Sequence, residues 1–369
     1  MSPRSGREDG GGEGGPAAES GDESIGRSGL RDVEGSTDSM DSARSTDAPE
    51  DPRASADAPV ALAIMGPTSS GKTALSIEVA RRLDGEVVSM DSRSVFRGMD
   101  VGTAKPTPQE RGGVPHHGID VTDPSERFGA GRWARYARQV IAQIRARGRV
   151  PLLVGGTGFF LRALTHPIFA EPELDAARRD ALVRRLDGFA DAELHRWLAM
   201  LDSATAARLG AWGGRQRLLR ALELPLLTGR PLSWWHAHAP PEAPPVHVLP
   251  FVLDVPRERI DASVNGRVQG MVDAGLVDEV RGLVARYGED APGLNAHGYA
   301  ELIPYLRGER TLDEALELVR KNTRAYTRRQ DTWNRRQLPA GAVWIDATRP
   351  RAELADEIAA RWRAAAGTH

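Results

Sequence analysis

Cysteine is absent from the 369 residues of the chain. This absence excludes disulfide bonds, thiolate metal sites and cysteine nucleophiles. Long apolar runs are missing as well: no stretch approaches the roughly 18 apolar residues of a membrane-spanning helix, and the N-terminus has no apolar signal segment. We therefore expect a cytoplasmic protein that does not bind a membrane.

Large apolar side chains are nearly absent from residues 1–57, which are rich in Gly, Ser, Asp and Glu. Such a segment cannot bury a core, so we predict a disordered acidic tail. It holds 14 acidic and 6 basic residues, a net charge of −8, whereas the whole chain carries −2. The rest of the chain therefore carries +6, and a basic body fits a polyanionic partner.

The strongest positive signal is a strand, a glycine loop and a helix in immediate succession. Val60–Met65 has the composition of a buried parallel strand, and Ala74–Leu83 has the apolar spacing of a helix. The loop between them matches the P-loop pattern G-x-x-x-x-G-K-[ST] in full, with Gly66, Pro67, Thr68, Ser69, Ser70, Gly71, Lys72 and Thr73. Backbone N–H groups, the helix N-terminus and Lys72 would bind phosphate oxygens, and the Thr73 hydroxyl would ligate Mg²⁺. We predict a phosphate or diphosphate site.

A second predicted strand, Glu86–Met90, ends in Asp91. Ligands of open α/β sheets bind at the carboxyl ends of strands, so we expect Asp91 beside the P-loop. Its carboxylate would contact magnesium or act as a base on a second substrate, unless it only caps the next turn. The loop 95–106, which contains Thr103 and Lys105, is predicted to bind substrate.

An acidic residue is missing after the third predicted strand, Val150–Val154, where P-loop NTPases usually carry a magnesium-binding aspartate. A hydrolytic ATPase is therefore disfavoured. The sequence Gly-Gly-Thr-Gly at 155–158 is predicted instead to let a second substrate approach closely, with Thr157 as a hydrogen-bond donor. The adjacent His116 and His117 would point in different directions, so we favour a packed, hydrogen-bonded role over metal ligation.

Basic residues dominate the second half of the predicted core. Val246–Leu253 is expected to be the last strand, with Arg257 at its carboxyl end as a diphosphate clamp. Leu312–Arg336 reads as a long helix with a basic stripe and interleaved aromatic residues. This stripe suits a nucleic-acid backbone with stacking on a base, and a solvated face is the alternative.

These patterns predict an α/β fold with a P-loop, nucleotide-kinase-like parallel sheet core and a helical insertion domain. The expected divisions are the acidic tail 1–57, the first part of the core 58–171, the insertion 172–212, the second part of the core with the basic helix 213–340, and a C-terminal segment 341–369.

Taken together, these stretches resemble the bacterial tRNA dimethylallyltransferase family, in family order from about residue 60 to 340. The segments that carry the resemblance are Gly66–Thr73, Asp91-Ser92, Gly98–Pro106, Pro115–Asp120, Leu152–Thr157, Gln216–Glu223, Arg257, Asn265–Arg267, Gly298-Tyr299 and Arg328–Trp333.

The resemblance implies transfer of a dimethylallyl group from its diphosphate to N6 of the adenine just 3′ of the anticodon in tRNA. The P-loop would then hold the diphosphate with Mg²⁺, Asp91 would be the general base, and Thr73 and Arg257 would stabilise the leaving group. The enzyme would act as a monomer on the anticodon stem-loop. The positions implied for tRNA binding are Asp91, Ser92, Arg93, Ser94, Thr103, Lys105, Thr157, Arg179, Gln216, Arg217, Leu218, Leu219, Arg220 and Gln330.

Three alternatives share the P-loop. A small-molecule kinase would bind ATP there, although the missing carboxylate and the basic helix argue against it. An adenylate isopentenyltransferase would run the same chemistry on free nucleotides and leave the basic surface idle. A nucleotide-dependent RNA-binding switch would need no base beside the phosphate site.

Overall fold

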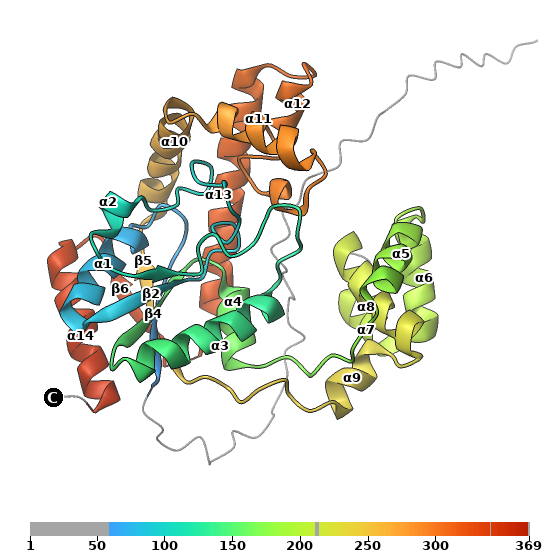
Figure 1. Ribbon diagram of the computed structural model, residues 1–369, viewed down its shortest axis with the longest axis horizontal. Coiled ribbons are helices and arrows are strands. Elements are labelled where there is room, and N and C mark those ends of the chain that lie inside the picture. Colours follow the sequence, from blue (N-terminus) through green and yellow to red (C-terminus); the bar gives the residue numbers. More distant parts are fainter. Residues whose placement is uncertain (1–58, 211–213, 340, 368–369) are drawn as a thin grey trace, which may run out of the picture. The chain divides into compact units, whose positions relative to one another are not determined.

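The computed structural model describes residues 59–210, 214–339 and 341–367, which all belong to one compact unit of the chain. The tail predicted at residues 1–57 lies outside the described residues. Within the described part, six strands form one sheet in the order β3-β2-β4-β1-β5-β6, and all neighbours pair in parallel. Figure 1 shows this sheet between α1 and α14 on one side and α3 and α4 on the other. The predicted α/β fold with a parallel core is therefore confirmed.

The strands are short and follow the predicted bounds closely where they are buried. They are β1 (Ala61–Met65), β2 (Gly85–Ser89), β3 (His116–His117), β4 (Val150–Gly155), β5 (Val248–Asp254) and β6 (Val343–Asp346). The expectation that the strand ending near Leu253 is the last one is wrong, because β6 pairs with β5 much later in the chain. Only Ile345 of β6 is fully buried, and Trp344 is 38% exposed, so this edge strand lacks an apolar run.

Helices connect the strands and cover both faces of the sheet. They are α1 (Lys72–Leu83), α2 (Pro108–Arg111), α3 (Ala130–Ala146), α4 (Gly158–Thr165), α5 (Ala176–Leu186), α6 (Asp191–Leu201), α7 (Ser203–Leu209), α8 (Arg215–Thr228), α9 (Leu232–His238), α10 (Arg257–Asp273), α11 (Leu276–Tyr287), α12 (Ile303–Leu306), α13 (Leu312–Gln337) and α14 (Arg351–Ala366), with a 3₁₀ turn at Pro292–Asn295. No helix in the described ranges is long and apolar enough to cross a membrane.

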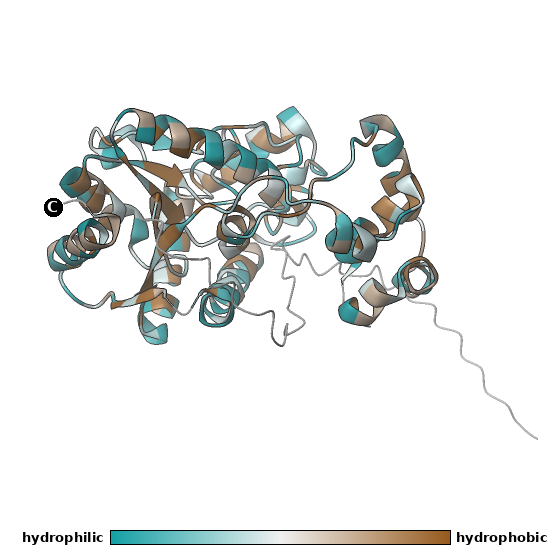
Figure 2. Ribbon diagram, turned by 90° about the horizontal axis from the view of Figure 1, so that it is seen from below, coloured by the Kyte–Doolittle hydropathy of each residue, from teal (hydrophilic) through white to brown (hydrophobic). Residues whose placement is uncertain are grey.

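Side chains alternate along β1 and divide the core into two layers. Leu62 and Ile64 pack with α1 and α14, whereas Ala61, Ala63 and Met65 pack on the side of α3, α4, α10, α11 and α13. All five side chains are fully buried. The strands are accordingly mostly hydrophobic in Figure 2, while the helices carry both hydrophilic and hydrophobic residues. A strand buried on both faces needs a continuous apolar run, which is why β1 is readable from the sequence.

Helices α5 to α8 share an apolar cluster that is separate from the sheet core. Leu186, Leu194 and Leu198 of α5 and α6 pack with Leu218 and Leu222 of α8. The shared cluster therefore includes a helix beyond residue 212, the expected end of the insertion.

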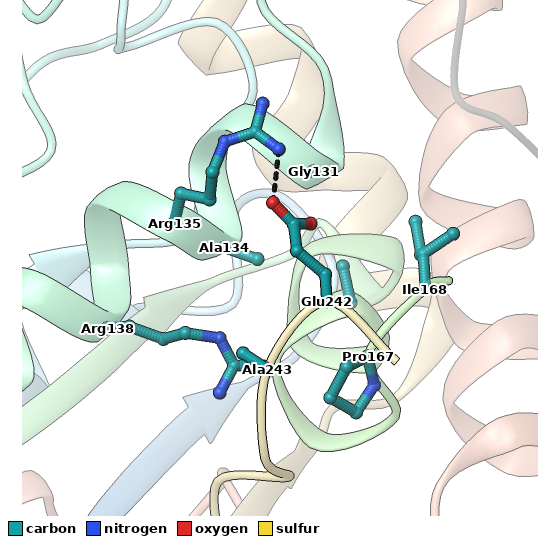
Figure 3. A pocket seen from close by; sticks show the side chains of 9 residues that line it. Gly131, Ala134, Arg135, Arg138, Pro167, Ile168, Glu242 and Ala243 are labelled. Atoms are coloured by element: carbon teal, nitrogen blue, oxygen red, sulfur yellow. Dashed lines mark hydrogen bonds and ion pairs between the residues drawn. The ribbon is translucent and has the colours of Figure 1, made fainter. Parts of the chain in front are cut away.

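Two linkers flank this helical group and run side by side. An isolated antiparallel bridge joins Phe169 to Pro241, and α3 holds the second linker through the ion pair of Arg135 with Glu242, 2.5 Å long. Arg138 donates to the carbonyls of Pro244 and Leu164, the latter at 2.9 Å. The side chains of Arg135, Arg138 and Glu242 line a small cavity of about 190 Å³ (Figure 3).

Glu86 is a buried carboxylate at the beginning of β2, and we expect it to stabilise the fold. It accepts hydrogen bonds from His117 Nε2 (2.6 Å) and Arg147 Nη2 (2.7 Å), and its side chain is 3% exposed. Burial opposes ionisation, but the hydrogen bonds from Arg147 and His117 outweigh it and lower the pKa of Glu86 to about 2.

Glu86→Gln should lower the free energy of unfolding at pH 7 by roughly 2–3 kcal/mol. Because the folded pKa lies below the unfolded value, the difference should persist above about pH 4.5 and shrink as the pH falls toward 2. Denaturant titrations across this pH range measure the free energy of unfolding of the variant and the natural chain, with exposed Glu309→Gln as the control. A difference that does not change with pH would contradict this assignment.

Candidate active site

A pocket of about 380 Å³ lies at the carboxyl ends of β1, β2 and β4. It brings together twelve of the residues expected from the sequence to bind diphosphate or tRNA. These are Thr68, Ser69, Ser70, Gly71, Lys72, Thr73, Asp91, Ser94, Thr103, Lys105, Thr157 and Gln330. The pocket thus unites the P-loop with the ends of two other strands, as the parallel topology requires.

The P-loop has the backbone geometry of an anion site. Gly71 caps α1 with φ at +84°, a conformation that favours glycine. The first turn of α1 contains no acidic residue. Lys72 Nζ donates to the Pro67 carbonyl at 2.6 Å and to Ser70 Oγ at 3.3 Å, which folds the lysine back along the loop. Backbone N–H groups, the helix N-terminus and an ammonium group therefore converge on the pocket.

Burial changes the acid–base behaviour of Lys72. Desolvation and the nearby guanidinium of Arg267 lower its pKa from 10.5 to about 7, while Asp91 opposes the shift. A lysine in this state becomes more strongly charged when an anion arrives, because the anion favours the ammonium form.

Asp91 both caps a turn and lines the pocket. Its Oδ1 accepts the backbone N–H of Arg93 at 2.7 Å and that of Ser94 at 3.4 Å. These bonds fix the carboxyl group beside the P-loop residues that line the same pocket. Capping of the turn, the alternative to a chemical role, therefore does not remove the Asp91 side chain from the site.

Ser92, Ser94 and Thr157 connect the ends of β2 and β4. The Ser92 backbone N–H donates to Thr157 Oγ1 at 3.3 Å. Ser94 is 5% exposed, and its hydroxyl lies 2.9 Å from that of Ser89. Ser94 and Thr157 line the pocket, whereas Ser92 is not among the lining residues.

The glycines at 155–158 are required by internal packing, and Gly155 and Gly156 also line the pocket, so their predicted role in admitting a second substrate stays a prediction. A Cβ on Gly156 would lie 2.0 Å from Gln330 Nε2, and one on Gly158 would lie 2.0 Å from the Trp333 ring. Both neighbours belong to α13. A Cβ on Gly155 would lie 2.3 Å from the Met90 carbonyl oxygen. The segment is glycine-rich because α13 and the end of β2 pack directly against its backbone.

Gln330 of α13 ties the P-loop to β4. Its Oε1 accepts the Thr68 backbone N–H at 2.9 Å, and its Nε2 donates to the Gly156 carbonyl at 3.0 Å. One turn earlier, Tyr326 also lines the pocket. Burial and then the Asp91 charge raise the pKa of Tyr326 to about 12, so this phenol remains protonated at neutral pH.

Arg257 follows the carboxyl end of β5, as expected from the sequence. It begins α10, its side chain is 42% exposed, and it pairs with Asp261 at 3.3 Å. It is not among the pocket-lining residues, whereas Arg267 of the same helix is. Arg267 Nη2 donates to the Thr103 carbonyl at 3.3 Å.

Arg267, Tyr326 and His116 are lining residues that sequence reasoning did not place in the site. The signal for Arg267 was present in the segment Asn265–Arg267, and that for Tyr326 in its spacing from Gln330.

Lys105 is held by internal partners although it lines the pocket. Its side chain is 4% exposed, and Nζ donates to the Phe96 carbonyl at 2.9 Å. It also pairs with Asp100 at 2.5 Å and with Asp120 at 2.7 Å. These contacts indicate that Lys105 shapes the loop 98–106.

Arg93, another expected tRNA position, is not among the lining residues, and its Nη1 donates to Asn295 Oδ1 at 3.0 Å. The other expected tRNA positions lie on α5 and α8, apart from the lining residues of the pocket. Arg179 and Arg220 both pair with buried Glu223 at 2.6 Å. Leu218 is 4% exposed inside the helical cluster, and Leu219 packs against it. Gln216 is exposed, and Arg217 follows it on α8.

The histidine pair is hydrogen-bonded within the fold. His116 Nδ1 lies 2.8 Å from the Val114 carbonyl oxygen, and His117 bonds Glu86. His116 Nε2 is buried without a hydrogen-bond partner. Among residues 59–210, 214–339 and 341–367, no group of three or more His, Asp or Glu side chains could hold a metal ion. A metal in this pocket would therefore depend on oxygen atoms of a bound substrate.

Comparison with known families identifies this architecture. The family described as "IPP transferase" matches residues 94–337, and the family "Isopentenyl transferase" matches residues 59–120. The tRNA dimethylallyltransferase of Roseiflexus sp. is 44% identical over 309 residues, which cover 78% of this chain and 99% of that protein. The one from Geobacter metallireducens is 44% identical over 285 residues, 77% of this chain and 91% of its own length.

Solved structures of prenyltransferases that act on tRNA are similar to this chain as well. The tRNA isopentenylpyrophosphate transferase of Bacillus halodurans superposes with a TM-score of 0.59 at 36% identity, over 83% of this chain and 97% of that one. A eukaryotic dimethylallyltransferase captured acting on tRNA gives a TM-score of 0.66 at 25% identity, over 78% of this chain and 73% of that one.

Proposed function

We propose that this chain, which belongs to the tRNA dimethylallyltransferase family, transfers a dimethylallyl group from dimethylallyl diphosphate to N6 of the adenine just 3′ of the tRNA anticodon. The observation that carries the proposal is the pairing, in one pocket, of a P-loop with Asp91, while glycine occupies the end of β4. This arrangement supports a site that binds a diphosphate and removes a proton.

In the proposed reaction, N6 of adenine attacks C1 of the dimethylallyl group while the bond from C1 to the diphosphate oxygen breaks. The Asp91 carboxylate accepts the proton that N6 releases. Lys72, the backbone N–H groups of the P-loop and the Thr73 hydroxyl stabilise the negative charge that grows on the leaving diphosphate. Arg267 of α10 stabilises the same negative charge. It takes the role that the resemblance gives to Arg257, whose side chain pairs with Asp261 instead.

Prenyltransferases generally need a divalent metal, and we propose Mg²⁺ here. Hydroxyl and carboxylate oxygens suit this ion, which usually keeps one or two protein ligands and completes its shell with substrate phosphates and water. Thr73, whose hydroxyl is the expected ligand, lines the pocket, and Ser69 Oγ is a buried oxygen without a hydrogen-bond partner. The bound ion would neutralise charge on the diphosphate.

The tRNA surface is proposed to include the outer face of α13, together with the helical group α5 to α8. Arg328 is exposed on α13, while Tyr326 and Gln330 of the same helix line the pocket. A helix with this division presents basic groups to a phosphate backbone and polar groups to a base. We further propose that the protein acts as a monomer in the cytoplasm.

Neutralising Arg328 should weaken tRNA binding without affecting the diphosphate. For each phosphate contact that is lost, the slope of log K against log salt should flatten by about 0.7–0.9. Filter-binding titrations of Arg328→Gln at several salt concentrations measure it, with Arg145→Gln on α3 as the matched control. Equal slopes for both variants and the natural chain would exclude Arg328 from the tRNA surface.

The decisive experiment incubates the protein with tRNA, Mg²⁺ and labelled dimethylallyl diphosphate, followed by analysis of the nucleosides for N6-modified adenine. Modified tRNA with release of diphosphate is expected. Label transfer to free adenine nucleotides but not to tRNA would favour an adenylate isopentenyltransferase. ATP binding with phosphate transfer would favour a kinase.

A further inference from the structure

One wall of the pocket is formed by the loop residues Thr103 to Pro106, and α11 holds the backbone just before it. Glu279 Oε2 accepts the backbone N–H of Asp100 at 2.9 Å and that of Val101 at 2.7 Å. Its Oε1 accepts the N–H of Gly102 at 3.0 Å. One carboxylate thus takes three consecutive backbone donors, so the conformation of the loop depends on that group.

Tyr299 fixes the carboxylate and the loop at once. The tyrosine is completely buried, and its hydroxyl donates to Glu279 Oε1 at 2.6 Å. Gly102 lies flat against the ring, since a Cβ there would be 2.5 Å from Cε2 and Cζ of Tyr299. The loop therefore cannot move toward the Tyr299 ring without a steric clash. It also cannot turn its N–H groups away without losing their hydrogen bonds to Glu279.

The held segment leads directly to the pocket. Thr103 follows Gly102, its Oγ1 donates to the Met99 carbonyl at 2.6 Å, and its own carbonyl accepts Arg267 Nη2 at 3.3 Å. Arg267 lines the pocket, and its charge acts on Lys72. Glu279 is not among the lining residues, so it reaches the site through the loop.

We infer that Glu279, supported by Tyr299, is a positioning residue for anion binding: it fixes the loop 100–103 so that the Thr103 carbonyl holds the Arg267 guanidinium in the pocket with Lys72. The inference rests on the proposed function for the identity of the anion, a diphosphate. It requires no contact between Glu279 and substrate.

The test measures binding of inorganic diphosphate with Mg²⁺ by calorimetry to the full chain. In Glu279→Gln, an amide N–H₂ faces backbone donors, so we expect the loop to shift and the dissociation constant to rise about tenfold. Arg267→Gln should weaken binding at least as much. Because both changes act on one contact, the double variant should bind no more weakly than Arg267→Gln alone. Asp278→Asn, the exposed neighbour on α11, is the control and should bind normally.

Tyr299→Phe keeps the ring and loses one hydrogen bond, so a smaller rise of about two- to tenfold is expected, again absent in the Arg267→Gln background. This variant decides the question if Glu279→Gln does not fold. Normal diphosphate binding with a lowered melting temperature, or additive effects in the double variant, would overturn the inference. A natural chain that binds diphosphate but modifies no tRNA would instead overturn the proposed function.

Discussion

Asp91→Asn should bind tRNA and dimethylallyl diphosphate nearly as the natural chain does, while kcat falls by roughly 10²–10⁴-fold. An exocyclic adenine amine is a poor nucleophile because its lone pair is delocalised into the ring, and its proton must leave as the C–N bond forms. The amide oxygen of asparagine can still accept the N–H groups of Arg93 and Ser94, which hold this side chain in place. It cannot take up the proton.

Single-turnover transfer at saturating substrate measures this loss, and filter binding measures tRNA affinity. Asp84→Asn, at an exposed carboxylate after α1, should leave both unchanged. A variant at Asp91 that loses diphosphate affinity but keeps kcat at saturation would show that the carboxylate holds the metal and is not the base.

Lys72→Ala should slow transfer by roughly 10²–10³-fold and weaken diphosphate binding, since the ammonium meets charge that grows as the leaving group departs. The side chain already folds toward the loop through Pro67 and Ser70, so little reorganisation is needed when the anion binds. Rapid-quench kinetics test it. Unchanged turnover would show that the lysine only supports the loop.

The lowered pKa of Lys72 gives this prediction a second readout. Above about pH 7 the free lysine is increasingly neutral, and diphosphate favours its charged form, so binding should take up a proton. Affinity should therefore decline as the pH rises above 7, by up to about tenfold per unit. Below pH 7 the lysine is already charged, and the uptake should vanish. Calorimetry in two buffers of different ionisation enthalpy measures the proton uptake on binding, and Lys72→Ala should lack the uptake that comes from the lysine.

The parts of the molecule that were predictable from sequence share one physical property: each is specified locally. Strands such as β1 are buried on both faces, so a continuous apolar run marks them. The P-loop joins such a strand to a helix N-terminus within eight residues, and Asp91 follows directly from the topology of parallel strands.

The parts that could not be predicted depend on partners far away in the chain. The glycines at 156 and 158 indicate close approach, but nothing local shows that Gln330 and Trp333 are what approaches. Likewise, the register of α10 places Arg267 in the pocket and Arg257 at the exposed beginning of the helix. The edge strand β6 buries too little to carry a periodic pattern.

The order of strands in the sheet has a consequence for synthesis of the chain on the ribosome. The central strand β1 emerges early and pairs with β4. Its other edge stays unpaired until β5 is synthesised, after helices α5 to α9. Helices α5 to α8 share an apolar cluster of their own and can fold before β5 is synthesised. Meanwhile the open edge of β1 presents unpaired N–H and C=O groups between fully apolar side chains, a surface prone to wrong pairing. Nascent chains that stall before residue 248 should therefore depend most on chaperones.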